Sequence, residues 1–305
     1  MQQEPTCKGQ RQGRTAVRPP KRKRQRPIDH GRQQKNETMK RTIYFLAAVT
    51  AVVLVFNACD TVPISGRKQL RLISERDMIG MSLQAYDAFL DTSQVLPDTH
   101  KDVIVVRRIG NRIKDAVVKY LTDNGELKRI DGFEWEFNVV NDPTVNAWCM
   151  PGGKVVVYTG ILPVTKDEKS LAVVMGHEIA HAVARHGNER MSQGLAVQLG
   201  GLALSVALSE HAPETQNLFL QSYGLGSNLG ILAYSRNHES EADKLGLVFM
   251  AMAGYDPESA IGFWQRMSEQ GGQAPPQILS THPSDETRIA DLKAFMPEAL
   301  KYYKP

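Results

Sequence analysis

The sequence predicts an α+β fold that is mostly helical, and three observations carry this prediction. Apolar residues recur at helical spacing along residues 171–183. Residues 133–139 alternate apolar and polar side chains, which is typical of a half-buried strand. Most of the chain after residue 187 has helical rather than strand patterns. With 305 residues and 42% hydrophobic content, the chain can bury one large core or two smaller ones.

The expected elements follow one another in a simple order. Ser74 can cap the first helix, Thr165 with Glu168 can form a capping box at the start of the central helix, and Gly187 is placed to end it. The apolar run 194–208 is expected to be a buried or membrane-facing helix rather than a span. Strands are expected at residues 133–139, 146–149 and 154–159. Helices are expected at residues 74–90, 102–121, 165–187, 215–230, 257–270 and 284–295.

The central helix carries the pattern His-Glu-x-x-His at His177, Glu178 and His181. The two imidazoles share one helical face and can reach the same Zn²⁺, while Glu178 lies beside them as a candidate general base. His186 follows His181 by five residues, which turns it away from the pair on a continuous helix. We therefore expect His186 to interact with the end of the helix. From His177 and His181 we expect one zinc ion per chain.

A zinc site needs a third protein ligand, and residues 235–243 offer carboxylates for it. Glu239 and Asp243 are four residues apart and lie on one helical face. Glu239 is the candidate third ligand, and Asp243 is the candidate acceptor for the far nitrogen of a ligand histidine. Glu241 is expected to point elsewhere. A charged, solvated helix face is the alternative for this cluster taken alone.

Together, the two segments resemble one gluzincin family of metallopeptidases, which holds the CAAX prenyl protease, the HtpX heat-shock protease and BepA-like periplasmic peptidases. The resemblance rests on His-Glu-x-x-His followed by Ser-Arg-x-x-Glu-x-x-Ala-Asp. Further matches are Asn-Ala-x-x-x-Pro-Gly-Gly at residues 146–153, Thr-His-Pro…Arg-Ile at residues 281–289, and residues 62–70. The resemblance spans roughly residues 60–295, and the single-domain envelope lipoprotein members are the most similar group.

The resemblance implies a zincin-like domain with a small antiparallel sheet beside the His-Glu-x-x-His helix. It also implies that the strand at residues 154–158 is a sheet edge, to which a polypeptide substrate adds as an extended strand. His282 and Arg288 are the implied catalytic donors for the oxyanion, and a neutral His282 can alternatively approach the open position of the metal. The residues expected to bind the substrate are Asn146, Gly153, Val155 and Val157.

Charge is distributed unevenly along the chain. Residues 1–41 hold 13 of the 37 Lys and Arg residues but only 3 of the 33 Asp and Glu residues. The rest carries 24 basic against 30 acidic residues, so the net charge of +4 hides an acidic folded part. The basic run at residues 21–24 ends before an apolar segment begins, and we therefore expect no nucleic-acid partner.

Residues 39–58 have the form of a signal peptide, with a basic start and a short apolar core before Cys59. Residues 56–59, Phe-Asn-Ala-Cys, resemble a bacterial lipobox. We therefore expect acylation of Cys59, which would anchor the chain at the periplasmic face of a bacterial membrane as an outer-membrane lipoprotein. A mitochondrial transit peptide is the alternative, because the upstream sequence is rich in arginine and poor in acidic residues.

These observations divide the chain into four expected parts and two candidate functions. The parts are a disordered basic extension at 1–38, the signal segment at 39–58, a linker at 59–73 and a zinc metallopeptidase domain at 74–305. The favoured function is a zinc-dependent endopeptidase that hydrolyses unfolded or misassembled envelope proteins. The alternative is a non-catalytic, zinc-stabilised chaperone or assembly factor, and the intact Glu178 favours the enzyme.

Overall fold

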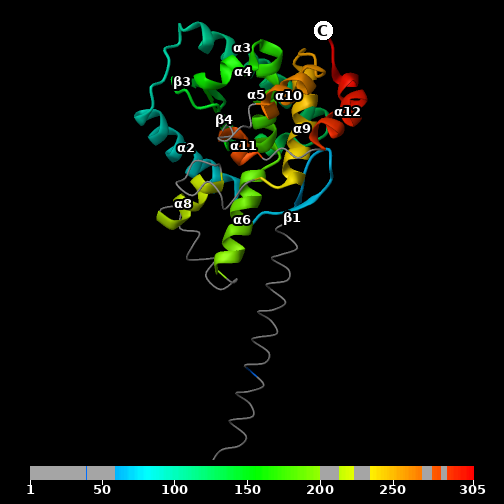
Figure 1. Ribbon diagram of the computed structural model, residues 1–305. Coiled ribbons are helices and arrows are strands. Elements are labelled where there is room, and N and C mark those ends of the chain that lie inside the picture. Colours follow the sequence, from blue (N-terminus) through cyan, green and yellow to red (C-terminus); the bar gives the residue numbers. More distant parts are fainter. Residues whose placement is uncertain (1–38, 40–58, 200–212, 223–233, 270–276, 283–286) are drawn as a thin grey trace, which may run out of the picture. The chain divides into compact units, whose positions relative to one another are not determined.

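The computed structural model describes residues 39, 59–199, 213–222, 234–269, 277–282 and 287–305 (Figure 1). The expected extension at 1–38, nearly all of the signal segment and the part of the apolar run beyond residue 199 lie outside these residues. Within the described part of the chain, no helix combines the length and the apolar character that crossing a membrane requires.

Helices dominate the described residues, which confirms the mostly helical α+β prediction. The helices are α2 (Glu75–Thr92), α3 (Lys101–Asp123), α4 (Leu162–Thr165), α5 (Glu168–Val183), α6 (His186–Leu199), α8 (Pro213–Ser222), α9 (Arg236–Met252), α10 (Ser259–Glu269), α11 (Gln277–Thr281) and α12 (Arg288–Ala299). Short 3-10 turns are η1 (Leu127–Ile130), η2 (Thr159–Ile161) and η3 (Leu300–Tyr302). The strands are β1 (Cys59–Thr61), β2 (Lys68–Leu70), β3 (Glu136–Val140), β4 (Ala147–Met150) and β5 (Lys154–Tyr158).

Helix α5, which carries His-Glu-x-x-His, starts and ends differently from the prediction. Its N-cap is Asp167, whose carboxylate accepts a hydrogen bond from the Ser170 amide at 2.7 Å, while Thr165 belongs to α4. The helix ends at Val183 because Arg185 adopts a positive φ of 60°, and α6 then starts at His186. The predicted stop at Gly187 is therefore wrong, and the chain turns two residues earlier.

The three-stranded sheet has the order β3-β5-β4 and is mixed rather than antiparallel. β4 and β5 form the expected hairpin about the Pro-Gly-Gly turn, while β3 pairs with β5 in parallel. β5 is therefore the central strand, and its expected position at the sheet edge is wrong. The physical signal was the continuous apolar run at residues 155–157, which is typical of a strand buried on both faces.

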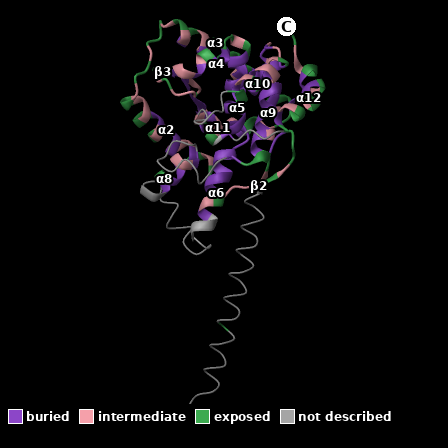
Figure 2. Ribbon diagram, in the orientation of Figure 1, coloured by how far each residue is buried: buried purple, intermediate pink, exposed green. Residues whose placement is uncertain are grey.

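The sheet separates two apolar clusters because its side chains alternate between its faces. Val155 and Val157 join the larger cluster with α3, α5 and α9, whereas Trp148, Val156 and Tyr158 pack with α2 in the smaller one. Figure 2 shows that α5 and α9 are almost entirely buried, with the outer helices half exposed. The metal-binding motif thus lies on the best-buried helix of the domain.

Helices α5 and α9 cross where two glycines meet. A Cβ atom on Gly246 would lie 2.9 Å from the His177 amide nitrogen, and one on Gly176 would lie 3.0 Å from the Gly246 carbonyl oxygen. No larger residue fits at Gly246 without moving a backbone. This close approach brings Glu239, near the start of α9, opposite the histidines of α5.

The segment 59–73, which was expected to be a linker, is structured. β1 pairs with β2 in an antiparallel hairpin that sets Cys59 opposite Leu70. The buried Gln69 amide donates to the Ala184 carbonyl oxygen at 3.0 Å, directly at the break between α5 and α6. This N-terminal hairpin is therefore part of the folded domain.

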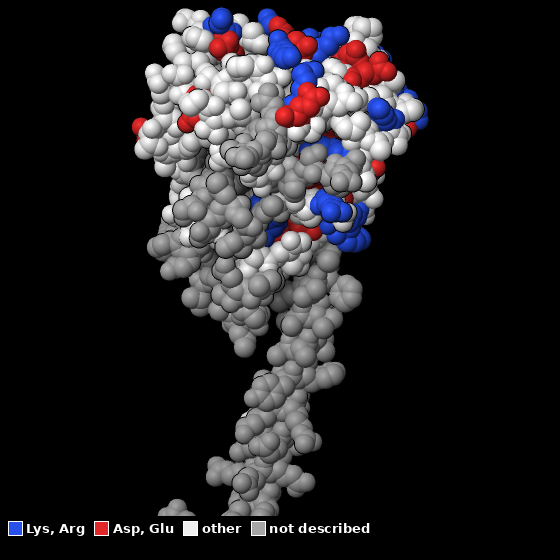
Figure 3. All heavy atoms as spheres, in the orientation of Figure 1, with Lys and Arg blue, Asp and Glu red and all other residues white. Residues whose placement is uncertain are grey.

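Charged side chains of both signs are interspersed on the face shown in Figure 3. Several are paired at the surface, including Lys119 with Asp123 and Arg107 with Asp98, each at 2.8 Å. Exposed pairs of this kind contribute little to stability. Among the residues coloured in that view, charge therefore does not mark out a binding surface.

Candidate metal centre

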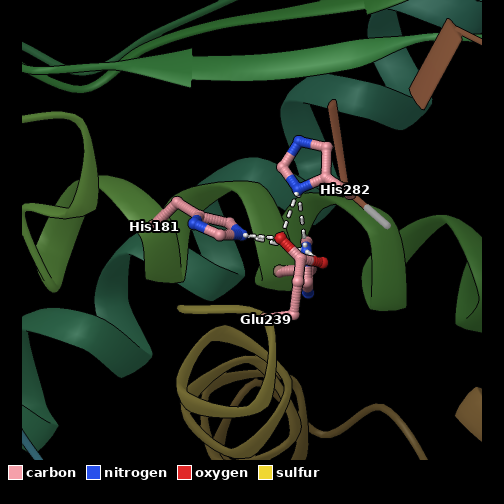
Figure 4. Close-up of side chains that lie close together, drawn as sticks. His181, Glu239 and His282 are labelled. Carbon is pink, nitrogen blue, oxygen red and sulfur yellow. Dashed lines mark hydrogen bonds and ion pairs between the residues drawn. The ribbon is translucent and has the colours of Figure 1, made fainter. Parts of the chain in front are cut away.

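Four buried side chains from three parts of the chain converge on one point. His177 and His181 come from α5, Glu239 from α9, and His282 directly follows α11. One ligand atom from each lies within 4.8 Å of all the others. Figure 4 shows His181, Glu239 and His282 directed toward one another. The structure thus brings together the three predicted metal ligands and His282.

The spacing of these atoms fits a shared metal ion. The Nε2 atoms of His177 and His181 are 3.0 Å apart, and each lies 3.4 Å from a carboxylate oxygen of Glu239. Two donors bound to one zinc at about 2.0–2.1 Å in tetrahedral geometry would be about 3.3–3.5 Å apart. Two nitrogens and a carboxylate oxygen are also donors that zinc accepts.

The ionisation of His181 and Glu239 also suits a cation, whereas for His177 burial lowers the pKa but hydrogen bonds to Asp243 and Glu239 outweigh it and raise the pKa to about 9. Burial lowers the pKa of His181 well below its usual value, so its imidazole is neutral and retains a lone pair. Burial opposes ionisation of Glu239, but His282, His177 and His181 outweigh it and hold its pKa well below 4.5. Among the described residues, Glu178 Oε1 and Glu239 Oε2 are buried without a hydrogen-bond partner. Basic groups lie near both oxygens, with Arg288 Nη1 at 3.5 Å from Glu239 Oε2 and His282 Nε2 at 3.6 Å from Glu178 Oε1, but neither oxygen accepts a hydrogen bond, so both can bind a further donor or a cation.

Asp243 lies where the sequence predicts it, behind His177. Its Oδ1 atom is 2.9 Å from His177 Nδ1, the nitrogen that faces away from the cluster. Arg288 donates to both Asp243 oxygens, at 2.6 and 2.9 Å, and its guanidinium carbon lies 3.3 Å from the ring centroid of Trp264. Arg288 is therefore fixed behind His177, and this position favours a positioning role over the predicted contact with an oxyanion.

His282 lies in the centre, although the chain places it 105 residues after His177. Its Nδ1 atom is 3.3 Å from His177 Nε2 and 3.1 Å from Glu239 Oε1. Its Nε2 atom is 3.6 Å from Glu178 Oε1. The imidazole therefore lies over the open side of the three-ligand set, between the metal position and the candidate base.

The residues predicted to bind substrate do not form a substrate surface. Val155 and Val157 are fully buried in the central strand, whose two neighbours occupy its backbone groups. Gly153 has a φ of 79°, and a Cβ there would lie 2.8 Å from the Trp135 ring, so packing explains this glycine. The Asn146 amide oxygen accepts from the neighbouring Ala147 N–H at 3.0 Å, within the strand. The prediction that these four residues bind the substrate is therefore wrong for the two valines, and packing or local hydrogen bonding accounts for Gly153 and Asn146.

Two residues near the centre were not identified by sequence reasoning. The Tyr234 ring lies 4.0 Å from the His181 ring and 4.8 Å from the His282 ring, between centroids. Its position directly before Ser235 was the available signal. His186 is fully buried and its Nδ1 atom is 2.9 Å from His181 Nδ1, so the prediction that it only interacts with a helix end is wrong.

Known proteins similar to this chain are named as metalloendopeptidases. Mitochondrial metalloendopeptidase OMA1 of Schizosaccharomyces pombe is 35% identical over 272 residues, which cover 87% of this chain and 75% of the relative. The OMA1 protein of Saccharomyces cerevisiae is 30% identical over 92% of this chain and 83% of the relative. A putative beta-barrel assembly-enhancing protease of Vibrio cholerae is 33% identical over 55% of this chain and 35% of the relative.

These similarities correct one prediction and support another. The long, high-coverage matches are to proteins named as mitochondrial, and this overturns the prediction of a bacterial outer-membrane lipoprotein. The expectation of a zinc endopeptidase is confirmed by the same names together with the His/Glu cluster. The model of peptidase family M48 matches residues 111–296, which include the whole of α5 and α9. The chain therefore belongs to peptidase family M48 and is a zinc metalloendopeptidase.

Proposed function

We propose that the chain hydrolyses unfolded or misassembled proteins with zinc held by His177, His181 and Glu239. The observation that carries this proposal is the convergence of these donor atoms beside two buried carboxylate oxygens that lack hydrogen-bond partners. A purely structural zinc site would need only its protein ligands and would not need Glu178. The position of Glu178 next to the cluster supports the enzyme over the chaperone alternative.

Zinc, when bound, supplies a Lewis acid that polarises a peptide carbonyl and makes water more acidic. Glu178 would accept the proton of the attacking water and pass it to the leaving amine. Its burial raises its pKa above the ordinary value of 4.5, which brings a general base closer to working pH. His282 Nε2 lies 3.6 Å from Glu178 Oε1, so His282 is next to the candidate base when the substrate is absent.

The substrate would add to the outer edge of β4, the last strand of the sheet, rather than to β5; within the described residues α11 contacts this edge ahead of β4, where Ile278 N–H donates to the Val145 carbonyl. Tyr158 N–H donates to the Asn146 carbonyl, so by antiparallel alternation Trp148 and Met150 also face β5. The backbone groups of Ala147 and Cys149 then face away from the sheet. Helix α5, which carries Glu178, packs against β4, and Ala147 and Cys149 belong to the same apolar cluster as residues of α5. An extended peptide on β4 would thus lie across the catalytic carboxylate.

Cleavage of a denatured protein tests the proposal directly. The purified chain should degrade casein, a chelator should stop this, and added zinc should restore it. Glu178→Gln should reduce cleavage by about 10²–10⁴, the contribution of a general base, while zinc content stays at about one per chain. Casein cleavage by Glu178→Gln at the wild-type rate would contradict the assignment of the base. A zinc-loaded wild-type chain that cleaves nothing would favour the chaperone function.

For the cellular location, we infer a mitochondrion from two observations. Relatives that match most of the chain are named as mitochondrial, and residues 1–41 are rich in arginine and poor in acidic residues. Import of the full chain into isolated mitochondria, and its loss when residues 1–38 are deleted, would support this location. Acylation of Cys59 stays a prediction, and the mass of the peptide that contains Cys59 tests it.

A further inference from the structure

A series of side-chain hydrogen bonds starts on the side of His181 that faces away from the metal position. His181 Nδ1 is 2.9 Å from His186 Nδ1, and the two rings meet edge to face at 74°. The break between α5 and α6 makes this contact possible, because the positive φ of Arg185 redirects the backbone before His186. His186 is completely buried, so water does not compete for its nitrogens.

The series of hydrogen bonds continues from His186 to the carboxylate of Glu241, and both oxygens of Glu241 also accept from other donors. His186 Nε2 is 3.1 Å from Glu241 Oε2. Arg67 of the N-terminal hairpin donates to both oxygens of Glu241, at 2.8 and 3.0 Å, and the Ser65 hydroxyl donates at 2.6 Å. With a guanidinium held this close, Glu241 is an ionised acceptor. Glu241 thus points away from the metal cluster, as the sequence predicts, and it is buried rather than solvated.

The positions of the ring protons of His181 and His186 follow from what each group in this series can donate or accept. A carboxylate only accepts, so His186 must carry its proton on Nε2. The Nδ1 atom of the neutral His186 ring is then an acceptor, and His181 must donate to it from its own Nδ1. This leaves the lone pair of His181 on Nε2, the atom that faces Glu239 and His177.

We propose that His186 and Glu241 are positioning residues that hold His181 in the ring orientation and tautomer needed to bind zinc. They would do for His181 what Asp243 does for His177, with Arg67 supporting Glu241 as Arg288 supports Asp243. This inference rests on the proposed role of His181 as a zinc ligand. It assigns the N-terminal hairpin a part in building the metal site.

A neighbouring pair of residues offers a matched comparison. Glu189 is as buried as Glu241, also binds Arg67, with two contacts of 2.7 Å, and also holds a buried histidine, His238, at 3.0 Å. His238, however, stacks on His186 and bonds Glu189 rather than His181. Both carboxylates thus stabilise the same network, and only Glu241 is connected to a metal ligand.

The first experiment measures zinc affinity of the full chain by competition with a chromophoric chelator. We expect His186→Leu and Glu241→Leu to weaken zinc binding about 10–100-fold, with about one zinc still bound at saturation. His186→Asn should retain most of the affinity, because its amide oxygen can accept from His181 Nδ1. Glu189→Leu should keep the wild-type affinity even where it lowers the melting temperature.

The second experiment reads the tautomer directly. In ¹⁵N spectra of the zinc-loaded chain, His181 should show a protonated Nδ1, and this signal should shift in His186→Leu but not in Glu189→Leu. Circular dichroism of each variant establishes that it folds. If His186→Leu or Glu241→Leu does not fold, the comparison is made between His186→Asn and Glu189→Leu.

Three outcomes separate the inference from the function on which it rests. Wild-type zinc affinity in His186→Leu and Glu241→Leu, together with zinc loss in His181→Ala, would overturn the positioning role alone. Equal loss in Glu241→Leu and Glu189→Leu would also overturn it, since the effect would then come from general destabilisation. Full zinc affinity in His181→Ala would overturn the proposed ligand set itself.

Discussion

The Nδ1 atom of His282 lies 3.3 Å from the Nε2 atom of His177, on the side of that ring that faces Glu239. His282 also contacts Glu239 at 3.1 Å. In this arrangement the imidazole is the fourth member of the donor cluster. We therefore expect that His282 has to move before a substrate can reach the metal.

We accordingly expect His282→Ala to raise the basal rate of casein cleavage, because the open position is no longer covered. The comparison is with wild type at equal zinc content. A fall of about 10²–10³ would instead assign His282 to transition-state stabilisation, the usual loss when one such donor is removed. An unchanged rate and pH profile would exclude both roles.

Zinc content should respond unequally to substitution of Glu239 and of Asp243, both in α9. Glu239→Ala removes a ligand and should leave little zinc after dialysis, measured by elemental analysis. Asp243→Asn alters the partner of His177 Nδ1 and of Arg288 but removes no metal ligand, so zinc affinity should fall about 10–100-fold. Glu258→Ala, an exposed carboxylate, is the control and should bind zinc normally. Full occupancy in Glu239→Ala would show that the third ligand is misassigned.

The glycine crossing of α5 and α9 should not tolerate a methyl group. Gly246→Ala places a Cβ 2.9 Å from the His177 amide nitrogen, and overpacking of this kind costs about 1–3 kcal/mol of unfolding free energy. Separation of the helices should also weaken zinc binding. Gly80→Ala in α2, where the Cβ meets nothing within 4 Å, is the matched control and should be neutral or stabilising. Chemical denaturation measures both, and equal stabilities would contradict the close packing.

Stability at acidic pH should depend on Glu189. Burial raises the pKa of this carboxyl, but the bonds from Arg67 and His238 outweigh burial and lower it from 4.5 to about 2. A depressed folded-state pKa stabilises the fold above the unfolded value, near 4.5, and this contribution is lost as pH falls toward 2. Glu189→Gln should therefore be less stable at neutral pH and should show a flatter pH dependence between pH 4.5 and 2.

The control for that measurement is Glu168→Gln, which removes an exposed carboxylate paired with Arg108. Exposed pairs contribute little, so its unfolding curve should follow wild type across the range. A wild-type slope in Glu189→Gln would show that Arg67 does not stabilise the charged form of Glu189.

Local patterns in the sequence were sufficient to identify the metal-binding residues. The i,i+4 spacing of His177 with His181, and of Glu239 with Asp243, fixes which face of each helix they share, whatever the rest of the fold does. The same argument was wrong for His186. It assumed a continuous helix, whereas Arg185 breaks the helix and is held by ion pairs to Asp60 and Glu75, far away in the sequence.

Strand order was also beyond local patterns. The alternation at residues 133–139 predicts a strand but does not say whether β3 joins β4 or β5, because pairing is decided by distant partners. Arg288 shows the same limit for side chains. Its sequence position gave it a place near the site, but only the fold shows that Trp264 and Asp243 hold it behind His177.

The crossing at Gly176 and Gly246 has a consequence for the maturation of the enzyme. Two metal ligands are neighbours on α5, but the third arrives only when α9 docks on α5, and Arg288 follows later still in the chain. An incompletely synthesised or partly folded chain holds only the two histidines, which bind zinc weakly without the carboxylate. Because metal binding is coupled to folding, zinc uptake reports completion of the C-terminal part of the domain. We therefore expect no proteolytic activity from a chain whose C-terminal part has not yet folded.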